Sequence, residues 1–166
     1  LSGDRALVGA HRDDDKGVSS GSAYVFQRQA DGSWKQAAKL LAADGATSDI
    51  FGYSVSLSGD RALVGAYGDD DKGVGSGSAY VYQRQADGSW EQTGKLLAAD
   101  GAASDDFGFS VSLSGDGALV GAYTDYVKGV NSGSAYTYSL ASRCTAQGYC
   151  ICKSGYGGAD CGTKLN

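Results

Sequence analysis

The 166-residue sequence contains no proline and no methionine, and it has one histidine. Glycine, with 27 residues, is about twice as frequent as in an average protein. A glycine-rich chain without proline is neither collagen-like nor a proline-rich disordered segment. No apolar run approaches the roughly 20 residues that span a bilayer, and a net charge of −5 gives no basic surface for nucleic acid. Without an initiator methionine or a signal peptide, we expect a processed chain or a fragment.

What the sequence does contain is an internal repeat. Residues 1–10 recur at 57–66, and again at 113–122 with a glycine in place of the arginine, so the offset is 56 residues both times. Residues 1–56 and 57–112 are identical at 46 positions. The third copy diverges after Ala122 and ends near Tyr138, and a tail with four cysteines follows.

Each repeat predicts four short strands. Residues 51–57 alternate apolar with small side chains, which is the period of a half-buried strand. Residues 61–66 predict a short strand buried on both faces, and residues 78–83 and 90–97 predict two more, joined by an Asp-Gly hairpin turn. Helix is the rival prediction only for residues 34–43, where the preceding hairpin turn favours strand. Along the chain this gives ten strands, in groups of three, four and three.

Four-stranded antiparallel meanders at a fixed period are typical of β-propeller blades, which bury their faces by stacking on one another. Phe51-Gly52, the Leu-Val-Gly-Ala of residues 63–66, the acidic loop after it and residues 77–82 resemble the FG-GAP repeat. This resemblance implies an all-β propeller like that of integrin α-chain heads and of many extracellular proteins of microbes and algae.

The resemblance divides the chain into a region of propeller repeats, residues 1–140, and a tail, residues 141–166. The three repeat units are about residues 1–50, 51–106 and 107–140. Because propellers close with about four to eight blades, three units form an incomplete ring or part of a larger array. The strand edges at both ends then need partners. We expect a homo-oligomer or neighbouring subunits at these edges.

The tail is predicted to be a small disulfide module. Cys144, Cys150, Cys152 and Cys161 have the spacing C-x5-C-x-C-x8-C, which resembles the C-terminal half of an EGF-like module without its first two cysteines. Of the three pairings that four cysteines allow, we favour Cys144–Cys150 with Cys152–Cys161. A four-cysteine zinc site is the competing interpretation, which the single-residue gap between Cys150 and Cys152 fits poorly. Disulfides imply an oxidising compartment, so we expect a secreted or cell-surface protein.

An acidic loop after the apolar strand is the best candidate for a binding site. Asp13 and Asp15 in the first copy, and Asp69 and Asp71 in the second, belong to runs of three aspartates followed by lysine and glycine. Calcium needs several oxygen ligands, and the FG-GAP resemblance implies a calcium loop at this place. The aspartates are consecutive, however, and a solvated acidic turn is the other interpretation. The third copy keeps Asp125 alone in this run and is expected to have lost any site.

Aromatic residues give a second candidate, whereas catalysis has little support. The rings of Trp34 and Trp90 either stack on sugars or pack within the blades. His11 is replaced by tyrosine in the other copies, so we interpret it as a surface residue and not as a base or a ligand. Because no nucleophile motif and no phosphate-binding glycine fingerprint is present, we do not expect an enzyme.

Together these patterns predict an extracellular structural or adhesion protein. Its blades would form the scaffold and assembly surface of a cell-surface, matrix or appendage filament. The alternative is a secreted carbohydrate-binding lectin with repeated, calcium-dependent sites. A third class, an enzyme domain that carries such blades, would need catalytic residues outside this sequence.

Overall fold

The computed structural model describes residues 1–125, 132–141, 143–144 and 150–151, and all regular structure in this part is β. The described part contains no helix long and apolar enough to cross a bilayer. The strands are β1 (Arg5–Ala10), β2 (Ser22–Arg28), β3 (Trp34–Leu40), β4 (Ser54–Ser58), β5 (Arg61–Ala66), β6 (Ser78–Arg84), β7 (Trp90–Leu96), β8 (Phe107–Ser114), β9 (Gly117–Ala122), β10 (Ser134–Ser139), β11 (Arg143–Cys144) and β12 (Cys150–Ile151).

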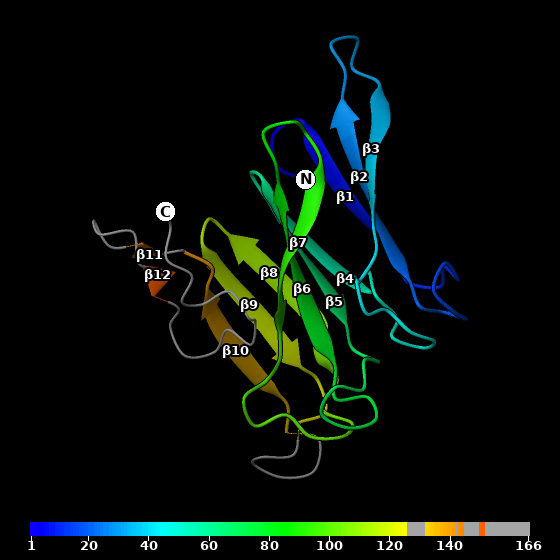
Figure 1. Cartoon of the computed structure of the whole chain (residues 1–166), viewed down its shortest axis with the longest axis vertical. Coiled ribbons are helices and arrows are strands. Elements are labelled where there is room, and N and C mark those ends of the chain that lie inside the picture. Colours follow the sequence, from blue (N-terminus) through cyan, green and yellow to red (C-terminus); the bar gives the residue numbers. More distant parts are fainter. Residues whose placement is uncertain (126–131, 142, 145–149, 152–166) are drawn as a thin grey trace.

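Strands β1 to β10 form three antiparallel sheets, which follow one another in chain order (Figure 1). The first blade is β1-β2-β3, the second is β4-β5-β6-β7 and the third is β8-β9-β10, and in each blade sequence neighbours pair. Meanders of this kind are propeller blades. The predicted all-β fold and its groups of three, four and three strands are confirmed.

Local turn chemistry explains the strand boundaries. Between β6 and β7, the Asp87 carboxylate accepts hydrogen bonds from the backbone N–H and the hydroxyl of Ser89, at 2.9 and 2.7 Å. Gly88 has φ +90°, a conformation that glycine adopts at little cost. The same turn in the first blade leads into β3, so the strand prediction for residues 34–43 is confirmed over Trp34–Leu40.

The predicted strand over residues 51–57 begins later than expected, at Ser54. The reason is that Phe51 pairs with the preceding blade: it forms a parallel bridge with Gly21, and its N–H donates to the Ser20 carbonyl at 3.1 Å. The first residues of this predicted strand therefore lie in the joint between the first and second blades.

The two faces of the second blade pack on different neighbours. Alternate residues of β5 and β6 (Ala62, Val64, Tyr80 and Tyr82) join a hydrophobic cluster with the first blade. The residues between them (Leu63, Ala79 and Val81) join a second cluster with the third blade. This alternation is the strand period of two. Residues 62–66 are consequently buried without interruption, as the sequence predicts.

Each outer blade has one covered and one exposed face. Val8 is 50% exposed, whereas its copies Val64 and Val120 are fully buried. Leu119 is 45% exposed, whereas its copy Leu63 is fully buried. We call the exposed side of the first blade, with Val8, the first end face, and the exposed side of the third blade, with Leu119, the second end face.

Candidate functional site

The acidic loops connect β1 to β2 in the first blade and β5 to β6 in the second. In the second blade, the Asp69 carbonyl accepts hydrogen bonds from the Gly77 N–H at 2.8 Å and from the Ser76 hydroxyl at 3.3 Å. The Asp70 carboxylate accepts the Gly75 N–H at 2.8 Å. These bonds fold the loop on itself and leave Asp69 only 4% exposed.

A lysine ammonium lies at the centre of the second loop's carboxylates. Lys95 Nζ, from β7, is 2.9 Å from Asp69 and 2.7 Å from Asp71. It is also 2.8 Å from Asp44, which comes from the first blade. Oxygen atoms of the three carboxylates lie within 4.8 Å of one another. The Tyr80 hydroxyl is 2.7 Å from Asp69 and 3.0 Å from Asp44, so it donates to either of them.

Burial and charge together set the protonation states of this cluster. Burial lowers the pKa of Lys95, but its hydrogen bonds to three carboxylates outweigh burial and raise the pKa above its ordinary value. Burial raises the pKa of Asp44, but the hydrogen bond and charge of Lys95 outweigh it, so the pKa lies below its ordinary value. Burial, and then the neighbouring Asp69, raise the pKa of Tyr80. At neutral pH the cluster therefore holds a charged lysine and a neutral tyrosine.

The first copy has the same arrangement in a more open setting. Lys39 Nζ is 2.9 Å from Asp13 and also contacts Asp15. Ser22 and Tyr24 donate to Asp13 at 2.8 and 2.9 Å. The hydrogen bond from Lys39, followed by those from Ser22 and Tyr24, lowers the pKa of Asp13. Lys39 is 29% exposed and Lys95 only 13%.

The third copy keeps part of the cluster. Asp125 is 1% exposed, and the Tyr136 hydroxyl is 2.7 Å from it. The same hydroxyl is 2.9 Å from Asp100 of the second blade, which stands where Asp44 stands in the second copy. Burial, and then the hydrogen bond to Asp125, raise the pKa of Tyr136. Each blade after the first thus receives one carboxylate from the blade before it.

Two Phe-Gly dipeptides join the blades beside these clusters. Phe51 and Phe107 are fully buried. A Cβ atom on Gly65 would lie 2.0 Å from the Gly108 carbonyl oxygen, and one on Gly9 would lie 1.8 Å from that of Gly52. The backbone of each Phe-Gly therefore fits only against glycine.

A family model described as the FG-GAP repeat matches residues 1–26, 34–82 and 90–138. The chain belongs to the FG-GAP repeat family. Among curated proteins, none matches it. The family match covers all three blades and includes both Phe-Gly joints of this FG-GAP chain.

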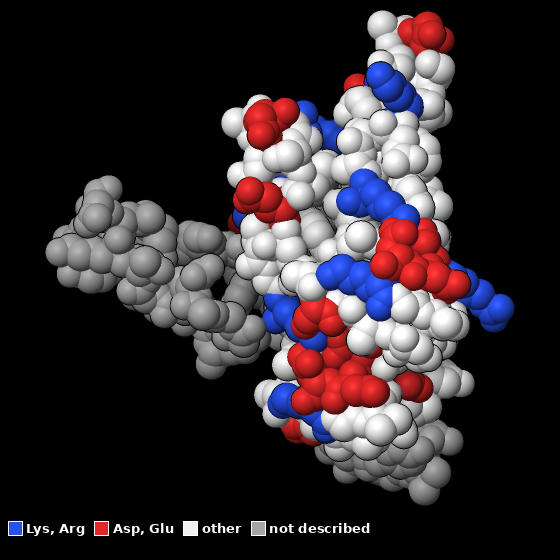
Figure 2. Space-filling model, turned by 45° about the vertical axis from the view of Figure 1, so that its right-hand side comes forward, with Lys and Arg blue, Asp and Glu red and all other residues white. Residues whose placement is uncertain are grey.

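Calcium, which the FG-GAP resemblance implies for these loops, does not fit the second cluster while Lys95 is charged. The ammonium already donates to all three carboxylates that would serve as ligands. Figure 2 shows acidic and basic side chains in mixed patches on the face it presents, not a uniformly acidic field. All four candidate aspartates are paired with a lysine: Asp13 and Asp15 with Lys39, and Asp69 and Asp71 with Lys95. Calcium binding in Asp13, Asp15, Asp69 and Asp71 stays a prediction for measurement.

Sequence reasoning missed the two lysines of this FG-GAP chain. Lys39 and Lys95 lie 26 residues after Asp13 and Asp69, and no local motif links them. The available signal was the repeat itself, because Lys39 and Lys95 are preserved at the 56-residue offset while several neighbours change.

The predicted aromatic residues lie on equivalent strands of neighbouring blades. Trp34, on β3, is 43% exposed, and Trp90, on β7, packs partly against the first hydrophobic cluster. Stacking on sugars stays a prediction for both.

A row of rings that the sequence did not indicate crosses the joints at the loop end of the blades. It consists of His11, Tyr53, Tyr67, Phe109 and Tyr123. Centroids of consecutive rings are 4.7 to 5.5 Å apart, so His11 acts here as a packing ring.

The disulfide prediction concerns residues that are only partly described. The register of β11 and β12 places Cys144 opposite Cys150. Cys152 and Cys161 lie outside the described residues. The EGF-like module, the pairing of its cysteines and the competing zinc site stay predictions.

Proposed function

We propose that this FG-GAP chain is part of an extracellular structural or adhesion protein, in which the blades are a scaffold and the end faces join neighbouring blades. One observation carries the proposal: apolar side chains that are buried inside the array have exposed copies at its ends. Val8 on the first end face and Leu119 on the second are about half exposed, while Val64 and Leu63 are fully buried. Exposed apolar surface with a buried internal counterpart favours a binding surface.

The apolar sides of the two end faces correspond to the two sides of an internal joint, but the Phe-Gly segment of a joint has no copy in the first blade, β1-β2-β3. The side of the second blade that covers the first corresponds to the first end face, and the side that covers the third corresponds to the second end face. Joining them is a head-to-tail contact, which closes into a ring or continues as a filament. The partners would be further copies of this chain or neighbouring subunits with the same repeat.

The remaining parts of the proposal come from the sequence. Four cysteines within a short tail favour an extracellular setting. The polar clusters recur from blade to blade, whereas active sites are usually single, so the proposed role is not catalytic. His11, the single histidine of the chain, packs on Tyr53 with ring centroids 5.4 Å apart.

The first experiment measures the mass of the particle in solution by light scattering. If end faces join, the chain forms a discrete oligomer or a filament, and a Leu119→Asp variant shifts the particle towards the 16.9 kDa monomer. The matched control is Val74→Asp, because Val74 is 75% exposed in a loop of the second blade and on neither end face. A wild-type chain that stays monomeric at high concentration contradicts the proposal.

A lectin is the second candidate, and the ring row favours it. Tyr53 and Tyr123 are 41% and 63% exposed, and aromatic faces of this kind bind amphipathic ligands. Sugar binding on a glycan array that is lost in Tyr123→Ala, with an unchanged particle mass, would favour the lectin over the scaffold.

A further inference from the structure

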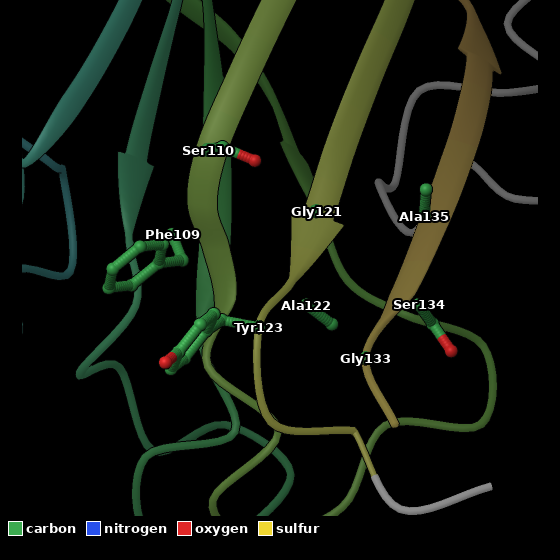
Figure 3. Close-up of a pocket in the computed structure, with 8 residues that line it drawn as sticks. All are labelled: Phe109, Ser110, Gly121, Ala122, Tyr123, Gly133, Ser134 and Ala135. Atoms are coloured by element: carbon green, nitrogen blue, oxygen red, sulfur yellow. The ribbon is translucent and has the colours of Figure 1, made fainter. Parts of the chain in front are cut away.

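The second end face has a pocket where the internal joints have a Phe-Gly backbone. The pocket has a volume of about 490 Å³ and opens between β8, β9 and β10 (Figure 3). Gly121 and Gly133 form part of its wall, and Ser110 and Tyr123 lie beside them. These four residues are the third-blade copies of Gly65, Gly77, Ser54 and Tyr67 at the 56-residue offset.

In the second blade, the same four positions hold the dipeptide Phe107-Gly108. A Cβ on Gly65 would lie 2.0 Å from the Gly108 oxygen, and one on Gly77 would lie 2.0 Å from the Phe107 oxygen. The Ser54 hydroxyl donates to the Gly108 carbonyl at 2.7 Å. Both glycines are therefore required by the close approach of a neighbouring backbone.

An aromatic residue directly after Phe-Gly completes each internal joint. The ring of Phe109 packs on Tyr67 with centroids 5.5 Å apart, and the ring of Tyr53 packs on His11 at 5.4 Å. On the third blade the corresponding ring, Tyr123, is 63% exposed. Leu119, the copy of the buried Leu63, is 45% exposed on the same face.

Among the described residues of the chain, no backbone of a neighbouring blade takes this place in the third blade. The atoms nearest to a Cβ on Gly121 belong to Ser110, and those nearest to a Cβ on Gly133 belong to Tyr123 and Ala122, all in the same blade. We infer that this pocket is a receptor slot for an extended segment with the sequence Phe-Gly-aromatic-Ser, supplied by another FG-GAP repeat. The inference deepens the proposed function and rests on it, because it names what the second end face recognises.

The third blade lacks one of the contacts that hold the next blade in the internal joints. In the internal joints an arginine also holds the next blade's Ser-Gly-Asp turn: Arg5 donates to the Gly59 carbonyl at 2.6 Å, and Arg61 pairs with Asp116. In the third blade Gly117 replaces this arginine. The third blade keeps Ser114 in the place of Ser58, whose hydroxyl accepts the Gly115 N–H at 3.0 Å across the internal joint. Contacts to the Phe-Gly strand remain beside it, as in recognition by strand addition.

The test is a titration of the full chain into a fluorescent peptide that spans residues 104–114, Ser-Asp-Asp-Phe-Gly-Phe-Ser-Val-Ser-Leu-Ser. We expect saturable anisotropy with the wild-type chain, and at least about tenfold weaker binding to Gly121→Val, whose side chain fills the slot. Gly117→Val is the matched control, because it lies on the same strand with only the Ser114 oxygen near its Cβ, at 3.4 Å.

A second peptide keeps the test independent of how the protein variants fold. Gly108→Val in the peptide should abolish binding to the wild-type chain, because a Cβ at this residue lies 2.2 Å from the Ser78 oxygen in the internal joint. Absence of wild-type binding overturns the inference, and so does undiminished binding by the Gly121→Val chain or of the Gly108→Val peptide. Particle mass is measured on the same samples. An oligomer without peptide binding removes only this inference, and a monomer that binds the peptide removes only the proposed function.

Discussion

The second blade and the outer blades carry nearly the same residues, yet they differ in what those residues touch. Strand β5 is buried along both faces, whereas its copy β9 is exposed at alternate positions. Lys95 meets three carboxylates, whereas its copy Lys39 meets two and is more exposed. Identical side chains therefore contribute differently to stability, depending on the neighbouring blade.

The largest expected difference in stability is between alanine substitutions of Gly65 and of Gly121. We expect Gly65→Ala to lower the free energy of unfolding by about 3 kcal/mol or more, because the new methyl group would lie 2.0 Å from the Gly108 backbone oxygen. Gly121→Ala should lower it by less than about 1 kcal/mol, because its methyl group meets the Ser110 hydroxyl, which can rotate away. Urea unfolding measures both, and equal losses would contradict the comparison.

Leu63 and Leu119 give the next effect. Leu63→Ala removes a fully buried side chain from the second hydrophobic cluster, and we expect a loss of about 3 kcal/mol. Leu119→Ala should cost less than about 1 kcal/mol in the monomer, because that side chain is 45% exposed. A large loss at Leu119 that depends on protein concentration would show that a partner covers the second end face.

The losses of stability on replacing Lys95 and Lys39 should differ by a smaller margin. Lys95→Met leaves Asp69 nearly buried and without its ammonium, at an expected cost of about 2 kcal/mol. Lys39→Met removes a more exposed ion pair and should cost less than Lys95→Met. Thermal unfolding of the two methionine variants measures the difference. Equal melting temperatures would mean that the carboxylate from the neighbouring blade contributes nothing.

The same cluster predicts a loss of stability in acid. The pKa of Asp44 is lower in the folded chain than its ordinary value of 3.8, so its contribution is present above pH 3.8 and is lost as pH falls below it. Asp44→Asn should therefore flatten the dependence of unfolding on pH in this range. Asp4→Asn makes the same charge change in an exposed turn and serves as the control. An identical profile for both variants would contradict the prediction.

The smallest effect is expected from calcium on the wild-type chain. Because the Lys95 ammonium donates to all three carboxylates, calcium and EDTA should leave the melting temperature unchanged. Lys95→Met leaves three carboxylate oxygens within 4.8 Å of one another, and it should gain a calcium-dependent increase. A calcium-dependent increase in the wild-type chain would instead support the calcium loop that the sequence predicts.

The strands could be predicted from the sequence because the information is local. The alternation over residues 51–57 and the turn glycines can be read without knowledge of distant residues. The exception is Phe51, which pairs with Gly21 of the preceding blade and not within its own predicted strand. The lysine clusters and the ring row could not be predicted in this way. Lys95 meets Asp44 across 51 residues of chain, and only the stacking of blades brings them together. The 56-residue repeat shows that the lysine recurs, but it does not show which carboxylates the lysine contacts.

The carboxylate that each blade donates to the next gives the array a direction. Asp44 of the first blade completes the cluster of the second, and Asp100 of the second blade contributes to that of the third. The carboxylate that a blade receives is therefore already synthesised when that blade leaves the ribosome, because domains made first also fold first. The chain can assemble from its N-terminus in the order of translation, with each finished blade acting as the template on which the following one folds.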